Sequence, residues 1–163
     1  MTRLYGWGIK GERVEEFVPD VRFERTSIIS AIGVNGFIAP MIYKGTLDAN
    51  FFATYVKKSL VNELNKGDIL VLDNLSSHKA YNGACLKPLI DKGVEILWLP
   101  PYSPDLNPIE LSWAKLKTII KKHKPRAVDE LMRVLKTALE EITKKDIMSW
   151  FKHDGYGSIS ANA

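Results

Sequence analysis

Residues 94–110 read Val94-Glu-Ile-Leu-Trp-Leu-Pro-Pro-Tyr-Ser-Pro-Asp-Leu-Asn-Pro-Ile-Glu110, and this stretch decides the fold. It opens with a largely apolar run up to Leu99, typical of a short strand covered on both faces. Four of the eight prolines follow in residues 100–108 and hold the backbone out of a helix until Pro108. Asn107 is then the expected N-cap and Pro108 the first helical residue. The stretch therefore predicts a strand, a stiff loop and a helix with Glu110 at its third position.

An earlier apolar run, residues 68–73, also ends in an acid, Asp73. It too is typical of a strand covered on both faces. Residues 77–91, between the two runs, are expected to form a helix. A strand, a helix and a second strand imply a parallel pair, whose carboxyl ends meet at one edge of the sheet. We therefore expect Asp73 and the segment after Leu99 to converge.

The remaining pattern predicts an α/β fold with a mixed sheet and C-terminal helices in a single domain, residues 1–163. Asn35-Gly36 separates two β-rich runs and favours a hairpin with a type I′ turn, which needs positive φ at both central residues. Asp48 is a plausible cap for the amphipathic helix that follows. The expected elements are a short strand near 13–18, hairpin strands at 26–34 and 37–43, helices at 47–64, 128–142 and 146–151, and a flexible tail at 153–163.

Composition limits the class of protein. A chain of 163 residues that is 45% hydrophobic and 26% charged can form a real core. No apolar run approaches the roughly 20 residues of a membrane-spanning helix, and no signal segment is visible, so we expect no membrane association. The single Cys85 excludes an internal disulfide and favours a cytoplasmic location. The net charge of +4 is compatible with a polyanionic partner.

Asp73 and Glu110 are the candidate metal ligands. Two carboxylates at one edge of a sheet suit a hard divalent cation, and such sites commonly perform phosphate chemistry. Each acid also has a purely structural interpretation. Glu110 could form a capping box with Asn107, and residues 73–78 contain ordinary turn and cap chemistry.

A basic stripe accompanies Glu110 on the predicted helix. The charged residues in line are Glu110, Lys117 and Lys121, beside an apolar face made of Ile109, Trp113, Leu116 and Ile120. Such a stripe can hold a phosphate backbone, although it can also be a solvated face. Lys117 and Lys121 are the candidate DNA-binding residues.

Asp73-Asn-Leu-Ser-Ser-His78, followed by residues 99–113, closely resembles the catalytic domain of bacterial insertion-sequence transposases in the mariner superfamily. The resemblance implies a ribonuclease H-like fold with a DDE acid triad. Asp73 would be the second acid and Glu110 the third. The supporting residues would be Asn74, His78, Asp105 and Asn107. The implied activity is DNA cleavage and strand transfer with Mg²⁺, or Mn²⁺ in its place, on transposon ends and target DNA.

The first triad aspartate is expected just upstream of Arg3-Leu-Tyr-Gly-Trp, and none of Glu12, Glu15, Glu16 and Asp20 follows a buried strand. We therefore expect a C-terminal fragment of a transposase that is inactive alone, located in the cytoplasm and on the nucleoid when bound to DNA. Its first strand would be missing from the centre of the sheet, leaving unpaired edges. The expected partners are DNA and either an upstream transposase fragment or further copies of the chain.

Two other functions remain in competition. A phosphatase with Asp73 as its nucleophile would need a second acid two residues later, but position 75 is Leu. A non-catalytic DNA-binding or assembly module is the stronger alternative, because the C-terminal helices carry lysines that could bind phosphates.

Overall fold

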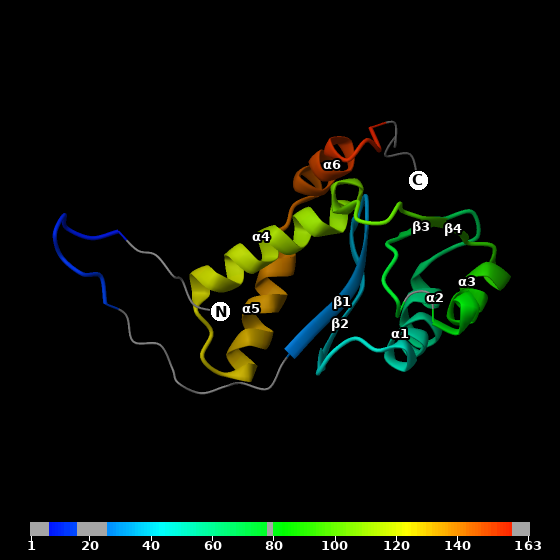
Figure 1. The fold of residues 1–163 in the computed structure, drawn as a ribbon, viewed down its shortest axis with the longest axis horizontal. Helices are drawn as coiled ribbons and strands as arrows, with labels where there is room; N and C mark the ends of the chain where they lie inside the picture. The colour runs from blue at the N-terminus through cyan, green and yellow to red at the C-terminus, as the bar shows by residue number, and fades with distance from the viewer. Residues whose placement is uncertain (1–6, 16–25, 78–79, 158–163) are drawn as a thin grey trace.

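A computed structural model describes residues 7–15, 26–77 and 80–157. It has a mixed α/β architecture with two small sheets, as Figure 1 shows. In chain order the elements are β1 (Thr26–Gly33), β2 (Gly36–Lys44), α1 (Ala49–Tyr55), the π-helix η1 (Val56–Leu60), α2 (Val61–Glu63), β3 (Ile69–Leu72), the 3₁₀ helix η2 (Ala80–Leu86), α3 (Lys87–Lys92), β4 (Glu95–Trp98), the 3₁₀ helix η3 (Pro104–Leu106), α4 (Pro108–His123), α5 (Val128–Glu141) and α6 (Lys144–His153).

The hairpin β1–β2 is confirmed, but the prediction of its turn is wrong. Gly33 pairs with Gly36, so Val34 and Asn35 form the turn rather than Asn35 and Gly36. Gly36 has a φ of 147°, whereas Asn35 is not among the residues with positive φ. Glycine accepts this backbone conformation at little cost. The chain therefore reverses direction between β1 and β2 without a left-handed conformation at Asn35.

Two hydrophobic cores lie on opposite faces of the hairpin. Figure 1 shows β1–β2 between α4 and α5 on one side and α1 to α3 on the other. The first core joins α1, η1, α3 and β3 with one hairpin face, to which Ile29, Ala31, Ala39 and Met41 belong. The second core joins α4, α5 and α6 with the other face, to which Ile28, Ile32, Phe37 and Ile42 belong. The hairpin therefore connects the two halves of the molecule.

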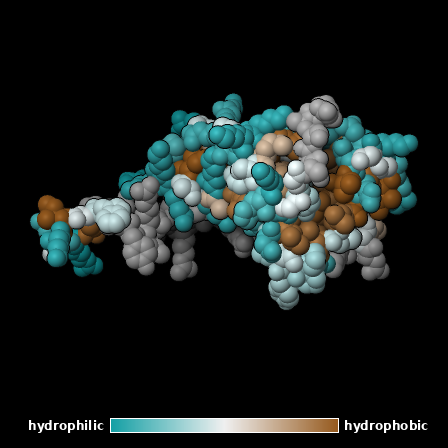
Figure 2. Space-filling view, turned by 90° about the horizontal axis from the view of Figure 1, so that it is seen from above, coloured by the Kyte–Doolittle hydropathy of each residue, from teal (hydrophilic) through white to brown (hydrophobic). Residues whose placement is uncertain are grey.

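The parallel pair β3–β4 is confirmed, with Leu72 opposite Trp98. Burial of both its faces, however, is a wrong prediction. Leu70 and Leu72 are buried in the first core, whereas Ile69 and Leu97 are 59% and 47% exposed. Figure 2 shows hydrophobic residues on the surface of the molecule. The open face exists because, among the described residues, the core of α4, α5 and α6 includes the hairpin and no residue of β3–β4.

The two sheets are separate, since β1 pairs with β2 and β3 with β4. Within the described residues, no strand lies between β1 and β3. The expectation that the first strand is missing from the centre of the sheet stays a prediction, because residues 1–6 and 16–25 lie outside the described residues. The short strand expected near residues 13–18 is absent from residues 13–15, and its remainder lies outside the described residues.

Other predicted helices differ in detail. The helix expected at 47–64 is a continuous helical run from α1 to α2 with a π-helical turn at Val56–Leu60. The helix expected at 77–91 is instead η2 followed by α3, since Gly83 adopts a φ of 80° that an α-helix does not accept.

Residues 153–157, expected to begin a flexible tail, contain the end of α6 and a turn packed against the fold. In the part of the chain described, no helix is long and apolar enough to cross a bilayer.

A salt bridge fastens α6 to α4. Lys115 Nζ donates to Asp146 Oδ2 at 2.6 Å, and Asp146 also forms a capping box with Thr143 at the start of α6. The hydrogen bond from Lys115, followed by those from Thr143, lowers the pKa of Asp146 to about 2. The ionised carboxylate therefore stabilises the fold above the ordinary carboxyl pKa, and this contribution is lost as pH falls from about 4 to about 2.

Asp146→Asn should lower the free energy of unfolding by about 1 kcal/mol at pH 7, because it removes a charged partner at a helix cap. The difference between wild type and variant should shrink as pH falls from about 4 to about 2. Thermal unfolding followed by circular dichroism measures both effects. Asp91→Asn is the matched control, since Asp91 pairs with Lys87 on the exposed surface of α3 and should contribute less than about 0.5 kcal/mol. Equal effects from the two substitutions would contradict the assignment.

Candidate metal centre

Asp73 lies directly after β3, and its carboxylate is held by the local backbone. The Leu75 N–H donates to Asp73 Oδ1 at 3.1 Å, the hydrogen bond of an Asx turn. The residue is half-buried. The end of the strand thus sets the position of the Asp73 backbone, and the turn sets the direction of its side chain.

Asn74 joins the ends of the two parallel strands. Its side-chain Nδ2 donates to the Leu99 carbonyl, and the Leu99 N–H donates to the Leu72 carbonyl at 2.8 Å. The start of the proline-rich loop is therefore held beside Asp73. In Figure 1 the chain runs from β4 into the first turn of α4, on the side where β3 also ends. This edge is where open α/β sheets place their ligands.

The loop between Leu99 and α4 is ordered by its prolines and by backbone hydrogen bonds. The Leu106 N–H donates to the Ser103 carbonyl at 3.2 Å, and the Asn107 N–H donates to the Pro104 carbonyl at 3.1 Å. Tyr102 has a φ of 58° and is fully exposed. A left-handed conformation is unfavourable for a tyrosine and persists only where the surrounding chain enforces it.

Glu110 is the third residue of α4, as predicted, but the capping-box interpretation is wrong. Asn107 forms no side-chain cap hydrogen bond, and its carbonyl accepts the Glu110 backbone N–H at 3.0 Å. The first turn is thus closed by the backbone alone. The Glu110 side chain is exposed and forms no hydrogen bond or ion pair within the described part of the chain. The carboxylate is available to a ligand.

The predicted supporting residues have different positions. Asn74 clamps the strand ends, whereas the side chains of Asp105 and Asn107 form no hydrogen bond within the described ranges. His78 lies outside the described residues. Ser77, next to it, has a buried hydroxyl with no partner among the described residues.

The basic stripe on α4 is exposed at Lys117 and Lys121, which share a side of the helix with Glu110. Lys115 is not part of it, because it pairs with Asp146. The predicted apolar face is correct in outline, since Leu116 and Ile120 are buried. Ile109 and Trp113 are half-buried, and the buried face is completed by Pro108, Ser112 and Ile119.

Glu110 is exposed and Asp73 is half-buried. Two cavities, of about 220 and 300 Å³, lie in the described part of the chain at the end of α6 and between β2 and η1, and neither is lined by Asp73 or Glu110. Small-molecule sites are usually concave and enclose most of their ligand. Neither of these two cavities is therefore an enclosed site around Asp73 or Glu110.

The donor set fits part of a site for a hard divalent cation. Asp73 and Glu110 offer carboxylate oxygens, and Mg²⁺ retains several waters when a few carboxylates bind it. Among the described residues, no group of three His, Cys, Asp or Glu side chains could hold a metal. The two acids therefore supply an incomplete ligand set.

Tyr156 is a residue near the site that sequence reasoning missed. Its hydroxyl donates to the Leu106 carbonyl at 2.9 Å, across 50 positions of sequence. Nothing in the local pattern around Tyr156 signals this contact, because it arises only when α6 packs against α4.

Several solved structures share this fold. The chain is similar to the "Mos1 transposase paired-end complex with left transposon end", with a TM-score of 0.76 and 18% identity, over 94% of this chain and 48% of that chain. It is also similar to the "Mos1 Strand Transfer Complex", with a TM-score of 0.73 and 18% identity, over 93% of this chain and 46% of that one. For the "Mos1 mariner paired end complex with Mn" the TM-score is 0.74 and the identity 17%, over 91% and 46%.

These likenesses confirm the ribonuclease H-like fold expected from the sequence. The chain spans about half the length of the Mos1 chains that it matches. No curated protein matches it. A sequence model described as "DDE superfamily endonuclease" matches residues 1–132, which is most of the chain. The protein therefore belongs to the DDE superfamily endonucleases.

Proposed function

We propose that this chain is the part of an insertion-sequence transposase that carries the second and third acids of a DNA-cleaving and strand-transferring site. The observation that supports the proposal most directly is the clamp from Asn74 to Leu99, which joins the segment carrying Asp73 to the loop that leads into Glu110. The similar Mos1 structures, a paired-end complex with a transposon end and a strand transfer complex, support the same function.

Asp73 and Glu110 would hold Mg²⁺, with Mn²⁺ as the alternative ion. Asp73 is oriented by the Asx turn, and Glu110 projects from a helix whose position follows from the loop after β4. Bound there, divalent ions would activate water or a DNA 3′-hydroxyl for attack on a phosphodiester and stabilise the leaving oxygen. A solved Mos1 complex with Mn supports this choice of ion.

Glu110→Gln and Asp73→Asn should each abolish saturable Mn²⁺ binding. Each substitution removes one of the two proposed anionic ligands, and a site with so few protein ligands depends on both. Electron paramagnetic resonance titration of free Mn²⁺ measures the loss. Glu95→Gln is the control, since Glu95 is exposed at the opposite end of β4 and should leave binding unchanged. Wild-type affinity in both acid variants would refute the proposed site.

A further acid is proposed to come from an upstream transposase fragment, on an extended segment placed between β1 and β3. These strands belong to separate sheets but pack on the same first core. A strand inserted there would pair with two edges that have no strand partner within the described residues. Its carboxyl end could bring an aspartate to the edge that carries Asp73.

The purified chain alone should therefore not cleave transposon-end DNA in the presence of Mg²⁺, and co-expression with the upstream fragment should produce a metal-dependent nick. A gel assay on labelled transposon-end DNA detects the product. Asp73→Ala in the co-expressed complex should abolish it. A robust nick by the chain alone that Asp73→Ala removes would contradict the need for a further acid, and an inactive, folded complex would contradict complementation.

A non-catalytic DNA-binding module remains the second candidate, because Lys117 and Lys121 are exposed on α4. Both functions use the stripe to hold phosphates, but only the catalytic one needs the acids. DNA binding that is indifferent to Asp73 and Glu110, in a chain that does not bind Mn²⁺, would favour the module.

The double variant Lys117→Gln, Lys121→Gln should weaken binding to duplex DNA and reduce the slope of log K against log salt by about 2, since each phosphate contact contributes roughly 0.9. Fluorescence anisotropy at several salt concentrations gives the slope. Lys57→Gln, Lys58→Gln is the matched control, because these lysines are exposed on η1 and leave the charge change identical. The same slope in both double variants would mean that the α4 stripe is an ordinary solvated face.

A further inference from the structure

Two polar contacts connect the ends of α6 to the chain on either side of Glu110. At the start of α6, Asp146 accepts a hydrogen bond from Lys115, which follows Glu110 on α4. Beyond the end of α6, the Tyr156 hydroxyl donates to the carbonyl of Leu106, which precedes Glu110. The segment that carries Glu110 is thus held at both ends by one helix.

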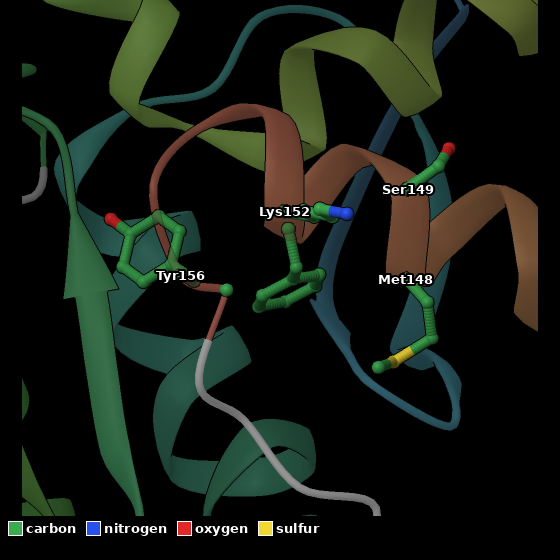
Figure 3. A pocket seen from close by; sticks show the side chains of 6 residues that line it. Met148, Ser149, Lys152 and Tyr156 are labelled. Atoms are coloured by element: carbon green, nitrogen blue, oxygen red, sulfur yellow. The ribbon is translucent and has the colours of Figure 1, made fainter.

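The turn that presents Tyr156 is itself well fixed. The Tyr156 N–H donates to the Phe151 carbonyl at 2.8 Å, and the Asp154 N–H donates to the Trp150 carbonyl at 3.0 Å. The rings of Tyr156 and Phe151 meet edge to face, with centroids 5.9 Å apart. In Figure 3 the Tyr156 hydroxyl points away from Met148 and Ser149, the pocket residues on α6. The ring is therefore oriented by α6 and not by the loop that it binds.

The hydroxyl is suited to act as a donor at neutral pH. Burial, and secondarily the nearby Asp154 carboxylate, raise the pKa of Tyr156 above its ordinary value. The phenol therefore stays protonated wherever the protein is folded under ordinary conditions. Its proton is directed to Leu106.

The start of α4 has no side-chain cap. A helix leaves its first N–H groups without intrahelical partners, and a side-chain cap usually satisfies one of them. Asn107 does not provide this cap. Glu110 lies in that uncapped first turn, and its side chain has no partner among the described residues to restrain it. A helix end without a cap tends to fray.

We propose that α6 and Tyr156 form a brace that positions Glu110, with Tyr156 as a positioning residue for the metal site. The brace itself is inferred from the contacts described above. Only its expected effect on the affinity for a divalent ion rests on the proposed function. Tyr156 lies beyond residues 1–132, the part of the chain that the family model matches. The brace is therefore inferred from the contacts of this chain and not from the family pattern.

The test is Tyr156→Phe, which removes the hydroxyl and keeps the ring on Phe151. Amide hydrogen exchange at residues 110–113 should accelerate roughly 3- to 10-fold, the effect of losing one hydrogen bond, while exchange in β1, β2 and α3 stays unchanged. Mn²⁺ affinity should fall several-fold. Tyr43→Phe is the matched control, because the Tyr43 ring stacks on Phe51 in another part of the molecule. A second variant, Asp146→Asn, removes the contact at the other end of the brace and should accelerate amide hydrogen exchange in α4.

Unchanged exchange at residues 110–113 in Tyr156→Phe would overturn the brace. Faster exchange throughout the fold would also overturn it, because it would reveal a general structural role. If exchange accelerates locally but Mn²⁺ affinity is unchanged, Tyr156 does not position the Glu110 carboxylate. If the wild-type chain binds no Mn²⁺, the proposed metal site fails, and the exchange comparison still decides whether Tyr156 orders the start of α4.

Discussion

Burial of Leu70 and Leu72 in the first core is the interaction on which the rest of the structure depends. Two-stranded sheets of four-residue strands are marginal by themselves, and each buried leucine contributes about 1.5–3 kcal/mol. Because these two side chains anchor β3 in the first core, β4 has a strand to pair with. Only then can Asn74 reach Leu99 and hold the start of the proline-rich loop beside the end of β3.

The hairpin packs against both hydrophobic cores, one on each of its faces. Its first face supports β3–β4, and its second face supports α4 to α6. The candidate site lies where these halves meet, with Asp73 contributed by the first and Glu110 by the second. A site assembled in this way would be sensitive to how α4 is held, and α6 contacts the chain both before and after Glu110.

Much of the fold could be predicted because its signals are local. Apolar runs locate β3 and β4, and the prolines ending at Pro108 locate the start of α4. The errors arose where local preference competed with packing. Asn35-Gly36 favoured one turn, but pairing of Gly33 with Gly36 selected another. The apolar composition of β3–β4 indicated two covered faces, but Ile69 and Leu97 are exposed, and within the described residues the core of α4 to α6 includes the hairpin and no residue of β3–β4. For the site, the sequence selected Asp73 and Glu110 by residue type and spacing, and could not say whether Asn107 capped the helix.

The sequence by itself determined that an acid follows β3 and where α4 begins, because these follow from periodicity, proline geometry and strand direction. Only the tertiary structure decided that Asn74 bonds to Leu99, that Lys115 pairs with Asp146 and that Tyr156 holds Leu106. These contacts span 25, 31 and 50 positions of sequence. Their partners are chosen by the packing of whole elements, which no local pattern encodes.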